Sequence, residues 1–169
     1  MTSILSWFPP RRALALVFLA AVVAMSSGYY VQHVIGLEPC PLCIVQRLGF
    51  VSAGLLAGIG ALLGARAAVL LFAGLSAMAS LAAGGVAAWH AWLIANPPEW
   101  AECGRPFAWM LENNSLVALI PKLFKGEGDC LRVDWTLFGF NIPQLALVLF
   151  TAMLLLSVIA IVGTVRGTR

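Results

Sequence analysis

Apolar residues fill four long stretches of the chain, which charged residues separate from one another. A helix needs about 20 mostly apolar residues to cross the hydrocarbon core of a bilayer. Each stretch is long enough, which predicts spanning helices at about 13–31, 44–65, 67–95 and 143–165. The pattern therefore predicts an all-α integral membrane protein, a four-transmembrane-helix bundle that forms a single membrane domain over residues 1–169.

Composition supports this assignment. Hydrophobic residues make up 62% of the chain and charged residues only 10%, whereas soluble domains are typically about a quarter charged. The first stretch has the basic start and small residues of a cleavable signal peptide, but its apolar core is longer than a usual signal core. We expect membrane lipids as surroundings, no nucleic-acid partner, and a monomer, because the glycine pairs of the second stretch indicate helix packing within the chain.

Basic residues set the expected orientation, since Lys and Arg of short loops are retained on the cytoplasmic side. They precede the first stretch, join the second to the third, and follow the fourth, at Arg11, Arg12, Arg66, Arg166 and Arg169. All seven acidic residues fall in the other two loops, at about 32–43 and 96–142. We therefore expect a multi-pass membrane protein with cytoplasmic termini and both acidic loops on the outer side, which in a bacterium means the inner membrane and the periplasm.

The larger loop contains "SLVALIPKLFK", in which apolar residues recur at helical spacing. The segment is too short to span, so it predicts a short helix lying in the membrane interface. A loop helix packed on the bundle is the alternative. Either arrangement would hold this loop near the membrane surface.

Four cysteines lie in the two outward loops, at Cys40, Cys43, Cys103 and Cys130. Disulfides persist in the periplasm. Of three pairings, the simplest joins the close pair Cys40 and Cys43 and leaves the other two together. Two structural disulfides are one interpretation. A zinc site of four cysteines is disfavoured because Cys103 and Cys130 are not a second close pair, and no metal is expected.

Three features favour redox chemistry at the close pair. A Cys-x-x-Cys ring encloses too few residues to stabilise a loop much. Cys43 stands at the expected start of a helix, where unpaired N–H groups favour a thiolate. Arg47 follows one turn later on the same face, and a charge inside a membrane is costly and usually functional. It could stabilise a thiolate or polarise a cofactor carbonyl; an arginine snorkelling to the headgroups is the alternative.

His90 lies near the outward end of the third stretch, in "AAWHAW", at roughly the depth of Arg47. It could be an interfacial residue of an aromatic belt formed with Trp89 and Trp92. The functional interpretation is a hydrogen-bond donor or proton carrier at the same cofactor as Arg47.

Taken together, these motifs resemble the DsbB family, membrane thiol oxidoreductases that reoxidise the periplasmic disulfide donor DsbA and pass electrons to quinone. The resemblance covers nearly the whole chain: four spans, "CPLCIVQR" heading the second, His90 in the third, and "GDC" followed by "WTLFGFNIPQ" before the fourth. It implies a protein-dithiol:quinone oxidoreductase that uses ubiquinone or menaquinone and sustains disulfide bond formation.

The resemblance also implies roles for individual residues. Cys40 and Cys43 would be the quinone-proximal pair, and Cys103 and Cys130 the pair facing the DsbA-like thioredoxin-fold partner. The partner's thiolate would attack Cys103 and release Cys130, and electrons would then reach the Cys40–Cys43 disulfide. Cys43 would contact the quinone ring, with Arg47 supporting it and His90 near the quinone.

Two other classes of protein remain as alternatives. One is a structural four-helix membrane protein whose disulfides only brace its loops. The other is a relative of vitamin K epoxide reductase, which also combines four helices with a Cys-x-x-Cys. That motif would be expected late in such a bundle, whereas here it opens the second span.

Overall fold

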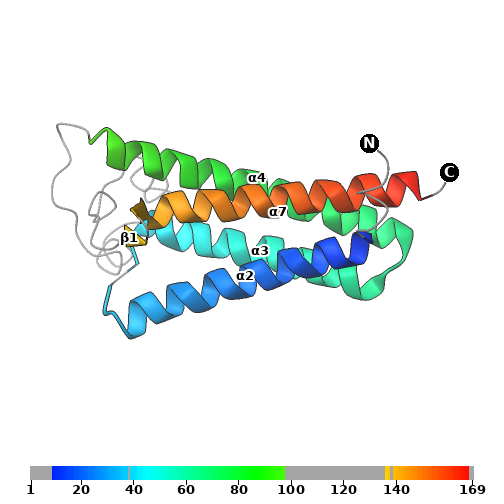
Figure 1. Cartoon of the computed structure of the whole chain (residues 1–169), viewed down its shortest axis with the longest axis horizontal. Helices are drawn as coiled ribbons and strands as arrows, with labels where there is room; N and C mark the ends of the chain where they lie inside the picture. The colour runs from blue at the N-terminus through cyan, green and yellow to red at the C-terminus, as the bar shows by residue number, and fades with distance from the viewer. Residues whose placement is uncertain (1–8, 38, 98–135, 138, 168–169) are drawn as a thin grey trace, which may run out of the picture.

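A computed structural model describes residues 9–37, 39–97, 136–137 and 139–167. Within these ranges it contains four long helices, each long and apolar enough to cross a membrane: α2 (Pro10–His33), α3 (Pro41–Leu63), α4 (Arg66–Ala95) and α7 (Ile142–Arg166). Figure 1 shows the helices running along one common direction, with the start of α2 and the end of α7 at the same end of the bundle. The predicted four-helix membrane fold is confirmed.

Proline sets where three of the helices begin. α2, α3 and α7 each carry a proline in the first two helical positions, where the missing N–H would have no intrahelical partner. These helices consequently start one to three residues before the expected spans. Hydropathy alone does not locate such a start, because proline is neither strongly apolar nor charged.

The cytoplasm-directed end of α3, by the expected orientation, stops earlier than the predicted span. Gly64 follows the helix in the left-handed conformation, with φ 64°, and its N–H donates to the carbonyl of Gly60. The guanidinium of Arg11 donates through Nε to the carbonyl of Ala61 at 2.8 Å. Arg11 therefore ties the first turn of α2 to the last turn of α3 and satisfies a carbonyl that the ended helix leaves open.

A short hairpin, with two residues in each strand, leads into α7. Strands β1 (Thr136–Leu137) and β2 (Phe140–Asn141) pair antiparallel, with Leu137 opposite Phe140. Asn141 then caps α7, because its side chain accepts from the N–H of Gln144 while the Gln144 side chain accepts from the N–H of Asn141. The helix predicted within "SLVALIPKLFK" lies outside the described residues.

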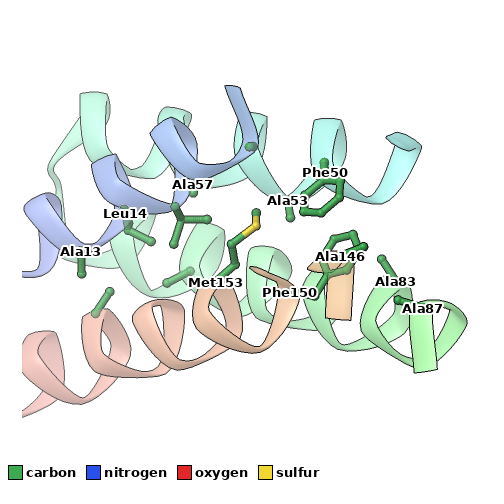
Figure 2. Close-up of a cluster of buried hydrophobic side chains, with 14 of the residues drawn as sticks. Ala13, Leu14, Phe50, Ala53, Ala57, Ala83, Ala87, Ala146, Phe150 and Met153 are labelled. Atoms are coloured by element: carbon green, nitrogen blue, oxygen red, sulfur yellow. The ribbon is translucent and has the colours of Figure 1, made fainter. Parts of the chain in front are cut away.

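Small residues let the helices approach closely. The core is largely alanine, and larger side chains fill the space between helices, as Figure 2 shows for Leu14, Met153, Phe50 and Phe150. The rings of Phe50 on α3 and Phe150 on α7 are stacked with centroids 4.0 Å apart. A side-chain carbon at Gly54 would lie 2.5 Å from that of Ala21 on α2, so this glycine serves packing within the chain.

Candidate functional site

Both cysteines of the Cys-x-x-Cys motif lie at the first turn of α3. Cys40 is the residue before the helix, and its Sγ accepts a hydrogen bond from the backbone N–H of Cys43 at 3.1 Å. The Cys40 sulfur thus takes the place that a serine or aspartate oxygen occupies in many helix caps. Both side chains are half-buried. Positive partial charge at the helix terminus therefore acts on Cys40 as directly as on Cys43, the residue that sequence reasoning singled out.

Arg47 lies one turn further along α3 and is held by α2. Its guanidinium donates to the side-chain oxygen of Gln32 at 2.5 Å and to the backbone carbonyl of Gly28 at 2.9 Å. A side-chain carbon added at Gly28 would lie 3.4 Å from Nε of Arg47, an ordinary van der Waals contact, so the guanidinium packs directly against this part of α2. The guanidinium is half-buried and clamped between two helices, an arrangement that differs from an arginine reaching freely to the headgroups.

His90 is buried on α4, with 2% of its surface exposed, and it faces the start of α3. Its Nδ1 lies 3.1 Å from Nε2 of Gln46, and its Nε2 lies 3.9 Å from Sγ of Cys40. Trp89 and Trp92, by contrast, are exposed and stack on each other with centroids 5.0 Å apart. The two tryptophans suit an aromatic belt, whereas His90 belongs to the interior of the bundle.

The structure gives Arg47 and His90 different neighbours. The hydrogen bonds of Arg47 described above go to α2, and those of His90 go to Gln46 and Cys40. Sequence reasoning placed both residues at one cofactor. Each residue does lie close to the Cys-x-x-Cys turn, His90 by direct approach to Cys40 and Arg47 by its place one turn after Cys43.

Gln46 is a residue that sequence reasoning missed. It is 3% exposed, precedes Arg47 on α3, and contacts His90 through its amide. The available signal was an uncharged polar residue entering an apolar span three positions after Cys43, where a polar group needs a partner.

Cys40, Cys43 and His90 offer donor atoms that all lie within 4.8 Å of one another. Thiolate and imidazole suit zinc and other thiophilic ions. With the Gln46 amide nitrogen turned toward His90, however, Nδ1 accepts and the neutral ring carries its hydrogen on Nε2, the nitrogen that lies 3.9 Å from Sγ of Cys40. A protonated nitrogen cannot be a ligand, which weighs against a metal held by this set as it stands.

Cys103 and Cys130, the second predicted pair, lie outside the described residues. So do the acidic residues of the larger loop. The described part of the candidate site is therefore the turn at Cys40–Cys43 with Arg47, Gln46 and His90 around it.

Four helices long and apolar enough to cross a membrane, with a Cys-x-x-Cys turn at the head of one of them, define a multi-pass membrane protein that carries a thiol pair at one end of its bundle. A family model described as "Disulfide bond formation protein DsbB" matches residues 10–160. The chain therefore belongs to the DsbB family, whose name supports a disulfide-forming oxidoreductase. This match favours that family over the vitamin K epoxide reductase relatives.

Curated relatives agree with this assignment. The chain is 45% identical over 160 residues to Disulfide bond formation protein B of Polaromonas sp. strain JS666, covering 95% of this chain and 92% of that protein. It is 42% identical over 167 residues to the protein of the same name from Acidovorax sp. strain JS42, and the match covers 98% of this chain and 94% of that protein. No solved structure matches the chain.

Proposed function

We propose that this protein is a protein-dithiol:quinone oxidoreductase that reoxidises a DsbA-like periplasmic thioredoxin-fold partner and passes two electrons to quinone. The observation that carries the proposal is the placement of Cys40 and Cys43 at the head of a membrane helix, with Arg47 clamped one turn further in. A thiol pair at this place can exchange with a soluble dithiol on one side and with a membrane-dissolved acceptor on the other.

The residues around Cys43 fit a quinone. Quinone, when bound, accepts two electrons and two protons and leaves as quinol. A guanidinium carries more N–H donors than its two bonds to α2 use, so Arg47 can also donate to a carbonyl oxygen. The clamp from Gln32 and Gly28 orients the guanidinium in advance, which lowers the cost of ordering it for binding.

The second cysteine pair completes the proposed electron path. The partner thiolate would attack Cys103, forming a mixed disulfide and releasing Cys130, and thiol–disulfide exchange would then reduce the Cys40–Cys43 disulfide. Each exchange conserves electrons, because one disulfide is broken for each one formed.

The reduction potentials of the partner and of ordinary disulfides explain why such a path needs a strong final electron acceptor. DsbA has a potential of about −120 mV, whereas ordinary structural disulfides lie below about −300 mV, so an ordinary disulfide would be disfavoured as its oxidant by roughly 8 kcal/mol. The Cys40–Cys43 pair must therefore be unusually oxidising, or electrons must be withdrawn continuously by quinone.

The proposed orientation places the termini in the cytoplasm and both cysteine loops in the periplasm of the bacterial inner membrane. Arg11 near the start of α2 and Arg166 at the end of α7 lie at the end of the bundle opposite to Cys40 (Figure 1). Arginines at that end and thiols at the other fit the retention of positive charge on the cytoplasmic side. We also propose that the protein acts as a monomer in the lipid bilayer.

The proposal is tested with the purified protein, a reduced DsbA-type partner and a water-soluble quinone analogue. Quinone reduction should be catalytic for the wild-type chain and lost in Cys43→Ala, because the sulfur nearest the membrane is removed. Arg12→Ala, a change of an exposed arginine at the other end of the bundle, serves as the control. Wild-type turnover in Cys43→Ala would overturn the proposal.

A trapping experiment separates this function from a purely structural role. In the Cys130→Ala variant, the thiol that resolves the mixed disulfide is missing, so a covalent adduct between Cys103 and the partner should accumulate. Disulfides that only brace loops would yield no such adduct. Cys103→Ala is the matched control and should give none.

A further inference from the structure

A buried pair of polar side chains lies directly behind Cys40. Gln46 of α3 and His90 of α4 are 3% and 2% exposed, and Nε2 of the amide lies 3.1 Å from Nδ1 of the ring. An amide nitrogen has hydrogens to give and no lone pair to offer, so Nδ1 accepts. The neutral imidazole then carries its hydrogen on Nε2.

The nitrogen that carries this hydrogen is the one that approaches the Cys40 sulfur. Nε2 of His90 lies 3.9 Å from Sγ of Cys40, and the backbone N–H of Cys43 donates to the same sulfur at 3.1 Å. Leu42 and Leu93 are buried and pack against Cys40, which keeps the neighbourhood apolar. Hydrogen bonds to a charged acceptor are stronger in such surroundings than in water.

We propose that Gln46 is a positioning residue that fixes His90 in the tautomer with hydrogen on Nε2, so that the ring donates to the Cys40 sulfur and stabilises it as a thiolate. The inference rests on the proposed thiol chemistry and assigns His90 to Cys40. Donors from two helices converge on this sulfur, so negative charge on the reduced pair is held at Cys40.

Reduction of the Cys40–Cys43 disulfide consumes two electrons and one proton when Cys40 is left as a thiolate. The partner's dithiol supplies two electrons, which break the Cys40–Cys43 bond. Cys40 becomes a thiolate, Cys43 takes one of the two protons that the dithiol gives up, and the other proton goes to water. Because the two donors stabilise the charged sulfur of the reduced form more than a disulfide sulfur, they make the Cys40–Cys43 disulfide a stronger oxidant. A more oxidising Cys40–Cys43 disulfide can accept electrons that originate from a DsbA-type dithiol, which an ordinary structural disulfide could not.

The tautomer is measured directly by nitrogen NMR of the full chain labelled with ¹⁵N-histidine, in a Cys103→Ser, Cys130→Ser background with the remaining pair reduced. We expect an unprotonated Nδ1 and a protonated Nε2 for His90. In Gln46→Met, which removes the amide at similar length, both signals should move toward averaged values. The exposed ring of His33 is an internal reference. A protonated Nδ1 with a bare Nε2 in the unsubstituted Gln46 protein would overturn the proposal.

The redox consequence is measured in the same background by equilibration with glutathione and alkylation of the thiols. His90→Phe keeps a ring and loses the donor, and should make the Cys40–Cys43 disulfide about tenfold less readily reduced, which corresponds to about 30 mV. Gln46→Met should lie between this variant and the unsubstituted pair. His33→Phe, the same change outside the site, should have no effect.

An unchanged equilibrium in both His90→Phe and Gln46→Met would refute the proposal. If His90→Phe does not fold, Gln46→Met and the tautomer measurement still decide it. Neither experiment contains quinone or the partner protein, so failure of the proposed electron transfer and failure of this inference give different results.

Discussion

Gln32 on α2 offers the sharpest test of how Arg47 is held. In the structure it accepts a hydrogen bond from one terminal nitrogen of the guanidinium, while the carbonyl of Gly28 accepts from the other. Gln32→Met keeps the length of the side chain and removes the acceptor. The guanidinium then keeps only its hydrogen bond to the Gly28 carbonyl among the two to α2, and it occupies its observed position for a smaller fraction of the time.

The size of the effect follows from polar contacts between membrane helices, which contribute on average about 0.6 kcal/mol and at most about 1.7 kcal/mol. Because 1.4 kcal/mol corresponds to about a tenfold change in an equilibrium, the equilibrium constant for the correctly placed guanidinium should fall about threefold to 15-fold, and the fraction in place should fall by at most that factor. An apparent affinity falls by the same factor as the competent fraction. We therefore expect the KM for quinone to rise, by at most about 15-fold.

The assay is steady-state reduction of a quinone analogue at saturating reduced partner. The kcat should stay near the wild-type value, since at saturating quinone the guanidinium is drawn back into place. Ser27→Ala is the control, because Ser27 lies on the same helix, is exposed, and bonds only to the carbonyl of Val23 within the described contacts. An unchanged KM in Gln32→Met, or a fall in kcat alone, would refute the role given to the clamp.

Three further changes test the fold by unfolding in detergent. Arg11→Ala removes the bond to the end of α3 and should lower the free energy of unfolding by about 1–2 kcal/mol, whereas Arg12→Ala should not. Gly49→Ala would drive a carbon into Ala83 of α4 and should destabilise by about 1–3 kcal/mol, while Gly74→Ala, which meets no atom within 4 Å, should be tolerated; equal effects would contradict the packing. Asn141→Ala should cost about 1 kcal/mol by uncapping α7, and no loss would contradict the cap.

Hydropathy predicted the helices well, because a bilayer requires spans of a certain length without charge. Both properties can be read from the order of residues alone. The start of α3 was harder to place. Pro41 begins the helix and the Cys40 sulfur caps it, so the motif lies across the helix boundary rather than before it. Arg47 was found from its charge and from its spacing after Cys43, which are local properties of the chain.

The neighbours of these residues could not be predicted in the same way. Whether Arg47 meets α2 or α4 depends on how α3 is rotated in the bundle, and a span that is apolar on all sides carries little information about rotation. Gln46 and Arg47 are adjacent in sequence, yet their hydrogen bonds go to different helices. The pairing of Gln46 with His90 therefore emerges only when the helices are packed.

In the proposed function, electrons pass from a protein dithiol through this chain to quinone. This transfer is tested most directly by mixing the purified protein with reduced DsbA-type partner and quinone without oxygen, and counting quinol and partner disulfide together. About one quinol should form for each partner disulfide, because thiol–disulfide exchange is a two-electron couple. Partner disulfide formed without quinol, or no reaction at all, would contradict it.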